Sequence, residues 1–280
     1  IELYKLLPKK NCGECKFPTC LAFAMQLANK KVSLEDCPYI DESAKTALQE
    51  SGAPPIKLIR FGPADRQLEI GDETELFRHD KKFYHPTALA ISIKDSIPED
   101  QQKSILEAAK DLEFDRAGQK LKLDAVLLAN DTGEAAPHEN LAKLAMSSIP
   151  SIGVIIHGKK AEALRPAAVA CRDRKPLLAS ADKNNLTEMS ALAKELNLPL
   201  VLTADNLEEL SAISSKAKES GVQDIVLDVT RQKLSEQLRD LTIIRRMAVR
   251  SNYRPFGFPT MIWAGTGEDA VSRATLGIAK

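Results

Sequence analysis

The chain has 280 residues, of which 44% are hydrophobic and 28% charged, proportions that are typical of soluble globular proteins. Its 39 basic and 39 acidic residues cancel, which argues against a nucleic-acid-binding protein, and no apolar run is long enough to cross a membrane. The start, IELYKLLPKK, lacks the sustained apolar stretch of a signal peptide, so we expect a cytoplasmic protein. A chain of this length has room for two domains.

Four cysteines near the amino terminus are the strongest functional signal. Cys12, Cys15, Cys20 and Cys37 have the spacing C-x2-C-x4-C-x16-C, with a proline directly after the last. Four thiolates around one centre suit an iron–sulfur cluster or a structural zinc ion. Zinc prefers two tight C-x2-C pairs, whereas one pair with a third thiol nearby and a distant fourth is closer to cluster ligation. We therefore predict a 4Fe-4S cluster on these four cysteines, with structural zinc and disulfides as the alternatives.

A short helix is predicted directly after the third cysteine. Pro18 and Thr19 are typical of a helix start, so Cys20 would lie in the first turn of a helix that runs to about Lys31. Its positive amino-terminal end would point toward the thiolates and favour an anionic cluster. Gly13 gives the backbone room to approach inorganic sulfides. The predicted apolar face of the helix consists of Leu21, Ala24, Met25 and Ala28.

The cysteine-bearing domain is predicted to span residues 1–50 and to end in a short helix at 43–50. Two prolines and a glycine at 51–55 interrupt any helix and indicate a linker. Two segments that follow, at 56–62 and 67–71, alternate enough to predict a short hairpin around residues 63–65. We assign residues 51–86 to linker and hairpin.

From residue 87 to residue 280 the chain alternates between apolar strands and helices. Strands are predicted at 87–93, 123–129, 152–157, 176–180, 199–203, 224–229 and 259–264. Helices are predicted at about 99–112, 137–147, 160–172, 186–196, 207–220, 231–249 and 268–280. Because the strands are apolar throughout, they are expected to be parallel and covered on both faces.

Seven strand–helix units in strict alternation predict an α/β fold with a TIM-type (β/α)8 barrel that is incomplete in this chain. A doubly wound open sheet is the alternative, but no glycine-rich dinucleotide turn follows the first strand. An eighth strand is expected beyond Lys280, because an unclosed barrel leaves two strand edges exposed.

Several polar residues fall at the carboxyl ends of the predicted strands, where barrel sites lie. His157 and Asp228 end the third and sixth strands, and the segment AGTGED at 264–269 could cradle a phosphate. For each of them an ordinary residue at the end of a strand or in a strand-to-helix turn is the alternative. Other residues are predicted to be structural: a helix cap for Asp205 and Asn206, a buried thiol for Cys171, and strand-entry positions for His79 and His85.

No serine-triad, zinc-protease or Walker motif is visible, so the sequence assigns no catalytic residue and favours a barrel that serves as a scaffold. Three stretches together carry a resemblance to a known family. They are the cysteine motif, the segment GDETELFRHDKKFYHPTA at 71–88, and SNYRPFGFP at 251–259. In these stretches the chain resembles the large (gamma) subunit of the corrinoid iron–sulfur protein, also called acetyl-CoA decarbonylase/synthase complex subunit gamma.

The resemblance implies a corrinoid-dependent methyl carrier of the methyltransferase class, working as part of a complex. Such a carrier takes a methyl group from a methyl-tetrahydropterin and passes it to acetyl-CoA synthase in the reductive acetyl-CoA (Wood–Ljungdahl) pathway. The 4Fe-4S cluster would return cobalt from Co(II) to Co(I). The family binds its corrinoid (cobalamin) in a carboxy-terminal domain that has no counterpart here, so the isolated chain is expected to be inactive.

The resemblance also implies partners. We expect a heterodimer with a small corrinoid iron–sulfur protein subunit, and encounters with a methyl-tetrahydropterin methyltransferase and with acetyl-CoA synthase, but no nucleic acid and no membrane. Two other functions stay open from the residues themselves. One is a cluster-bearing barrel enzyme that acts on a pterin or a phosphorylated substrate, and the other is a structural subunit stabilised by zinc.

Overall fold

A computed structural model describes residues 4–5, 7–28, 32–33, 36–40, 54–76, 85–110, 112–116, 119–265 and 268–279. The chain divides into two compact units, Ile1–Pro54 and Pro55–Lys280. The predicted helix at 43–50 and His79 lie outside the described residues. Each unit is considered by itself below.

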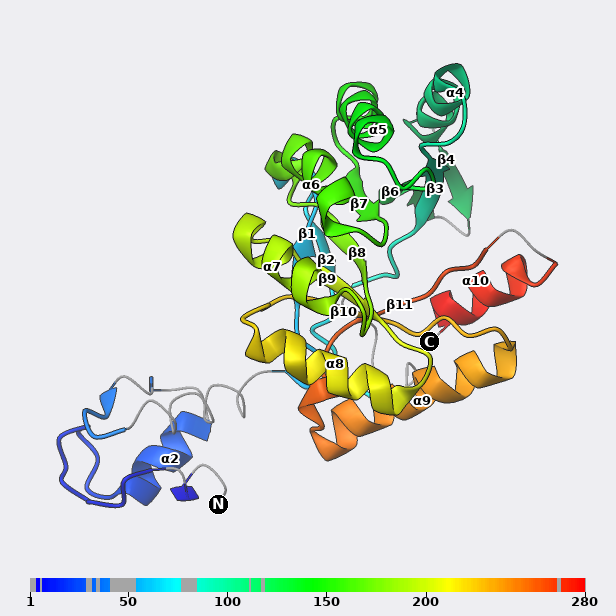
Figure 1. Ribbon diagram of the computed structural model, residues 1–280. Helices are drawn as coiled ribbons and strands as arrows, with labels where there is room; N and C mark the ends of the chain where they lie inside the picture. The colour runs from blue at the N-terminus through cyan, green and yellow to red at the C-terminus, as the bar shows by residue number, and fades with distance from the viewer. Residues whose placement is uncertain are drawn as a thin grey trace. The chain divides into compact units, whose positions relative to one another are not determined.

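The amino-terminal unit contains helix α2 (Cys20–Ala28) and a small core (Figure 1). The predicted apolar face of this helix is wrong in part, because Leu21 and Met25 are 50% and 62% exposed. Cys20 sets the orientation of the helix, since its thiol points inward together with the side chains three and four positions later. The buried residues of this core are Leu7, Cys15, Cys20, Phe23, Ala24, Cys37 and Ile40.

The larger unit is built on a parallel sheet of seven strands in the order β11-β10-β9-β8-β7-β6-β3. Each strand of the sheet pairs with the next one along the chain, so the order never reverses. This confirms the predicted barrel-type α/β fold over the doubly wound alternative, whose strand order changes direction. The strands are β3 (Ala90–Lys94), β6 (Ala125–Ala129), β7 (Gly153–His157), β8 (Leu177–Ala181), β9 (Leu200–Thr203), β10 (Ile225–Asp228) and β11 (Thr260–Met261).

Helices connect successive strands and cover the outer face of the curved sheet (Figure 1). They are α4 (Glu99–Lys110), α5 (Ala135–Ser148), α6 (Ala161–Ala170), α7 (Leu186–Leu196), α8 (Leu207–Glu219), α9 (Leu234–Ser251) and α10 (Ala270–Ala279). Short 3-10 turns η3 (Arg172–Arg174) and η4 (Arg254–Phe256) follow α6 and α9. One element was not predicted, the antiparallel hairpin of β4 (Glu113–Arg116) and β5 (Gln119–Lys122). None of the helices in the described residues is long and apolar enough to cross a membrane.

The inner face of the sheet is covered in part by the predicted hairpin, β1 (Ile59–Phe61) and β2 (Leu68–Ile70), with the turn η2 (Ala64–Arg66) between them. Ile59 and Phe61 are buried against inward-facing residues of β6 to β10. Gly153 permits this contact, because a Cβ at that position would lie 2.8 Å from the Leu68 Cδ1 atom. Burying a side chain such as Phe61 contributes roughly 2–3 kcal/mol, which anchors the hairpin to the barrel.

Strands β3 and β11 form the two edges of the sheet, and no further strand pairs with either edge in the part of the chain that the structure describes. A cavity of about 670 Å³ lies in the same region and is largely apolar. We call it the edge groove. Its wall includes Ser92, Thr260, Trp263, Arg245 and Gly277, from both edges and from α9 and α10.

Candidate metal-cluster site

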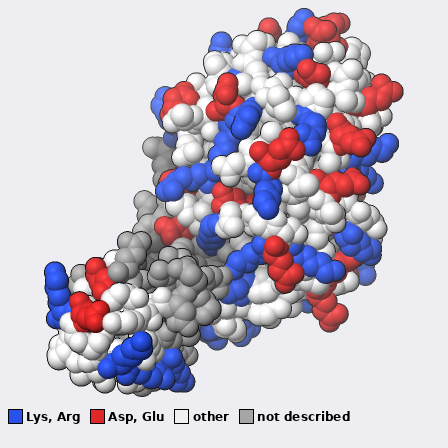
Figure 2. Space-filling view, turned by 60° about the vertical axis from the view of Figure 1, so that its left-hand side comes forward, with Lys and Arg blue, Asp and Glu red and all other residues white. Residues whose placement is uncertain are grey.

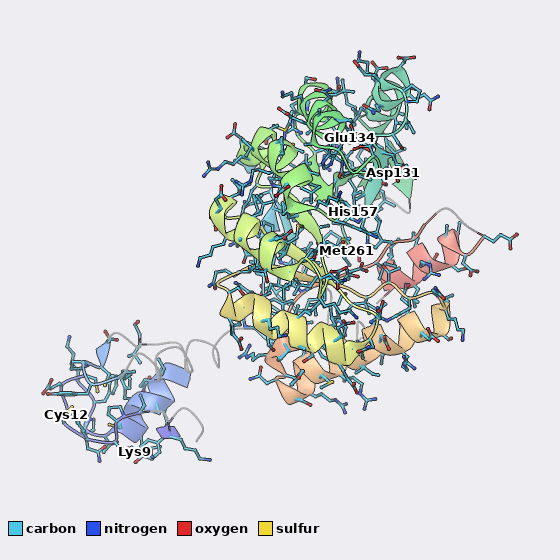
Figure 3. All side chains as sticks on the ribbon, in the orientation of Figure 1. Lys9, Cys12, Asp131, Glu134, His157 and Met261 are labelled. Atoms are coloured by element: carbon cyan, nitrogen blue, oxygen red, sulfur yellow. The ribbon has the colours of Figure 1, made fainter. Side chains whose placement is uncertain are left out.

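The four predicted ligands belong to one compact unit and are all free thiols. Cys15, Cys20 and Cys37 are only 9%, 6% and 6% exposed and share the core of that unit, whereas Cys12 is exposed. The three inner cysteines therefore share the buried core of this unit. Cys12, labelled in Figure 3, lies at the outer side.

The electrostatics of Cys37 show that the thiols are near one another. Burial raises the pKa of the Cys37 thiol, and the negative charges of Cys15, Cys20 and Cys12 raise it further, while a hydrogen bond from the backbone of Tyr39 lowers it. The Cys37 thiol is therefore within electrostatic range of the other three. Mutual repulsion of this kind is relieved when cationic iron binds the thiolates.

Among the described residues no group of three or more His, Cys, Asp or Glu side chains is arranged to hold a metal ion directly. The structure therefore does not itself place the four thiols as a ligand set around one ion. Gly13 has φ +79°, and a Cβ there would meet nothing within 4 Å. With four free thiols, three of them in one buried core, the residues present fit a cluster.

Two backbone N–H groups already point at sulfur. Asn11 N–H donates to Cys20 Sγ over 3.4 Å, and the backbone of Tyr39 donates to the Cys37 thiol. In return Cys20 N–H donates to Asn11 Oδ1 over 2.8 Å, and Ala22 N–H donates to Thr19 Oγ1 over 3.1 Å, so the first turn of α2 is capped. Hydrogen bonds to ligand sulfur stabilise the thiolate form and help to set the potential of a bound cluster.

A second set of side chains lies around Cys12. Tyr39 O–H donates to Glu14 Oε1 over 2.8 Å, and this bond to Glu14 raises the pKa of the tyrosine. Lys10 Nζ lies 4.2 Å from the centre of the Tyr39 ring, within the range of a cation–π contact. This arrangement ties the Cys12 loop to the turn after Cys37. Sequence reasoning missed it, because it joins residues 25 positions apart that have no shared motif.

At the carboxyl end of the barrel, the polar candidates are held by structural hydrogen bonds. Asp228 Oδ2 accepts from Trp263 Nε1 over 3.1 Å, and Oδ1 accepts from Thr230 Oγ1 over 2.6 Å. The ring of His157 lies 4.7 Å from that of Trp263, and burial lowers the pKa of this histidine. Figure 3 labels His157 together with Asp131 and Glu134, which follow β6. The pair Asp228 and Trp263 fastens β10 to the segment after β11.

The remaining predicted residues have structural surroundings. Asn206 caps α8, its Oδ1 accepting from Glu209 N–H over 2.9 Å, as predicted. Cys171 is fully buried, and burial raises its pKa to about 12, which makes it an inert thiol. His85 Nδ1 lies 3.7 Å from Glu69 Oε2 beside the edge groove. Residues 266–267 of the AGTGED segment lie outside the described residues.

Comparison with solved structures agrees with the fold. A mandelate racemase/muconate lactonizing enzyme from Sorangium cellulosum is similar with a TM-score of 0.50 over 92% of this chain and 64% of that chain, at 11% sequence identity. At this identity the likeness concerns the fold alone.

Two curated relatives are similar over nearly the whole chain. The chain is 42% identical over 259 residues to the corrinoid/iron-sulfur protein large subunit of Moorella thermoacetica, which covers 92% of the chain and 58% of that protein. It is 35% identical over 280 residues to acetyl-CoA decarbonylase/synthase complex subunit gamma of Methanothermobacter thermautotrophicus, covering 99% of the chain and 60% of that protein. The chain thus spans less than two thirds of the length of either relative, and the resemblance read from the sequence is confirmed.

Two family models also match, and they divide the chain as the structure does. A model for an Fe-S cluster matches residues 7–39, a range that includes the four predicted ligands. The model described as CO dehydrogenase/acetyl-CoA synthase delta subunit matches residues 58–273. Since that match covers more than half of the chain, the chain belongs to the CO dehydrogenase/acetyl-CoA synthase delta subunit family.

Proposed function

We propose that this chain is the cluster-bearing part of a cytoplasmic corrinoid iron–sulfur methyl carrier in the reductive acetyl-CoA pathway. The whole carrier would move a methyl group from a methyl-tetrahydropterin to acetyl-CoA synthase. The observation that carries the proposal is the set of four free cysteines, three buried and one exposed, within one small unit. The name of the Moorella relative, which combines a corrinoid with iron and sulfur, supports the same reading.

In this proposal, Cys12, Cys15, Cys20 and Cys37 hold a 4Fe-4S cluster. When bound, the cluster supplies single electrons that return the corrinoid cobalt from Co(II) to Co(I). Asn11 and Tyr39 donate backbone hydrogen bonds to ligand sulfur. The small core that contains Phe23 and Ile40 keeps water away from the inner thiols.

The larger unit is proposed to be a docking scaffold rather than a catalytic domain. Its most suggestive polar residue, Asp228, has both carboxylate oxygens engaged by Thr230 and Trp263. We propose that the corrinoid binds in the part of the longer relatives that these 280 residues do not match, and that the first strand of that part lies in the edge groove. The proposed partners are a small subunit in a heterodimer, a methyl-tetrahydropterin methyltransferase and acetyl-CoA synthase.

The test uses the longer protein, with the additional region that the relatives have, in its wild-type form and as Cys12→Ala/Cys15→Ala. With cobalt reduced beforehand, both proteins should accept a methyl group at the same rate in the first turnover. After cobalt has been oxidised, a low-potential donor should restore the wild type and the matched control Cys171→Ala, but not the double variant. Equal recovery of the double variant would overturn the proposed role of the cluster.

A further inference from the structure

We propose that the three lysines next to Cys12, namely Lys9, Lys10 and Lys16, form a docking surface for an acidic protein that delivers single electrons. We call these residues the lysine rim. The inference rests on the proposed function, because it requires a redox cluster on the four cysteines. It adds the side from which electrons enter and the charge of the protein that brings them.

The first observation is the asymmetry of exposure among the ligands. Cys12 is exposed, while the other three thiols are buried in the core of the unit. A donor protein at the surface can therefore come closest to the site at Cys12. All three lysines of the rim are exposed and lie within four positions of Cys12 in the sequence.

The second observation is local charge. The segment KKNCGECK contains three lysines and one acidic residue, Glu14, whose carboxylate accepts the hydrogen bond from Tyr39. Within the described part of the chain, none of the rim lysines is in an ion pair with a carboxylate. They remain available to an acidic partner.

The chain as a whole has a formal net charge of zero. On the face of the larger unit seen in Figure 2, basic and acidic side chains are interspersed, and many are ion-paired. Long-range attraction by the whole molecule is therefore weak, and a local excess of one sign decides where a charged partner docks.

The third observation is the backbone at the lysines. Lys9 and Lys16 have φ of 56° and 65°, the left-handed region in which glycine or asparagine costs less. Lysine is thus not the residue that these two backbone conformations favour. Lys10 is fixed differently, since its ammonium group lies 4.2 Å from the centre of the Tyr39 ring.

The chemistry of the step identifies the partner class. One electron passes from the donor protein to the cluster, so the donor is oxidised by one electron and the cluster is reduced by one electron. No bond is formed or broken. A low-potential carrier protein with an acidic surface matches both the electron count and the positive rim. Steering by complementary charge raises association rates by about 10-fold to 1,000-fold and weakens with salt.

The experiment compares two double variants of the cluster-loaded chain that have the same net charge. Lys9→Glu/Lys16→Glu reverses the rim, and Lys103→Glu/Lys143→Glu reverses two exposed lysines on α4 and α5. The probe is an acidic 2[4Fe-4S] ferredoxin, oxidised for calorimetric binding and reduced for stopped-flow electron transfer. The rim variant should lose at least about 10-fold in association rate at low salt, and the control variant less than about 2-fold. At about 0.5 M salt the rates of all three proteins should converge.

Two further measurements separate docking from other causes. Lys16→Asn removes one charge and relieves the left-handed backbone, so it should slow reduction by ferredoxin without lowering the thermal stability of the unit. Photoreduced deazaflavin, a small reductant with no docking surface, should reduce every variant at the wild-type rate.

The outcomes distinguish the two proposals. Equal ferredoxin rates for the rim and control variants, with iron content and spectra intact, would overturn the docking surface and leave the proposed function standing. Slow reduction of the rim variant by deazaflavin as well would also overturn it, because the defect would then lie in the cluster. A wild-type chain that holds no iron after anaerobic preparation would overturn the proposed function, and the docking surface with it.

Discussion

Asn11 has three roles directly beside Cys12, one of the four proposed ligands. Its side chain caps the first turn of α2, its N–H donates to Cys20 Sγ, and its backbone has φ 49°. The sequence identifies the four cysteines by their spacing. It does not identify Asn11 as the cap of a helix that begins nine residues later, because that contact exists only once the loop has folded back.

Asn11→Ala and Asn11→Gly separate two of these roles. Asn11→Gly keeps the left-handed backbone and removes the cap, which should destabilise the unit by about 1 kcal/mol. Asn11→Ala should lower the free energy of unfolding by about 1 kcal/mol more, because alanine is strained at this φ. The rate of cluster loss under air, followed by visible absorbance, should rise in the order wild type, glycine variant, alanine variant. Equal rates for the two variants would show that the backbone conformation is unimportant.

His138 makes the barrel sensitive to acid. It is fully buried on α5, its Nε2 lies 3.0 Å from the Leu128 carbonyl oxygen, and burial lowers its pKa from 6.5. The unfolded chain therefore binds a proton near pH 6.5 that the folded chain excludes, so stability is full above that pH and falls as the pH drops below it. His157 changes stability in the same direction, because burial also lowers its pKa.

Urea unfolding at pH 7.5, 6.5 and 5.5 tests this prediction. In that range, each buried histidine makes the free energy of unfolding change by up to about 1.4 kcal/mol per pH unit. His138→Gln should be less stable at pH 7.5 by about 1–3 kcal/mol but should have a shallower slope. An unchanged slope in His138→Gln would contradict the assignment.

At the scale of elements, helix α2 shows what patterning alone misses. The sequence predicts an apolar face with Leu21 and Met25, yet these are exposed and Phe23 is only 1% exposed. Several faces of a helix this apolar could turn inward, and the face that is buried carries Cys20, Phe23 and Ala24.

Two substitutions on α2 test which face is buried. Phe23→Ala should destabilise the amino-terminal unit by about 3–5 kcal/mol, because it leaves a cavity beside the ligands. Met25→Gln, two positions further along and on the solvent side, should change stability by no more than about 0.5 kcal/mol. The temperature at which the charge-transfer absorbance of the cluster is lost measures the stability of both variants. A larger loss for Met25→Gln than for Phe23→Ala would show that Met25 is on the buried side.

The strands and helices of the barrel were predictable because apolar runs of strand length recur with helical segments between them. Helix ends were less predictable. The segment 231–233 was expected in α9, but Arg231 leaves the helix to donate to Asp240 and the Ala204 carbonyl oxygen. The β4–β5 hairpin was missed because its strands are short and charged, with lysines and Glu113 paired across it.

At the scale of the whole molecule, the order of the strands in the sheet follows from the alternation of strands and helices along the chain. The edge groove lies where the two edge strands of the seven-stranded sheet, β3 and β11, are not paired with each other. The sequence could not reveal that the first hairpin lies against the inner face of the sheet, since Ile59 and Phe61 meet strands more than sixty residues away only in the folded unit. The exposure of Cys12 and the lysine rim around it also depend on the folded loop.

The identity of the metal centre is the central claim, and anaerobic purification followed by metal analysis tests it most directly. With a 4Fe-4S cluster bound, the protein should contain about four irons per chain and show a broad charge-transfer band that bleaches with dithionite. Cys12→Ala or Cys15→Ala should lose the iron, and Cys171→Ala, whose thiol is buried in the other unit, should keep it. Stoichiometric zinc without iron, or an iron content unaffected by loss of Cys12 or Cys15, would contradict the account.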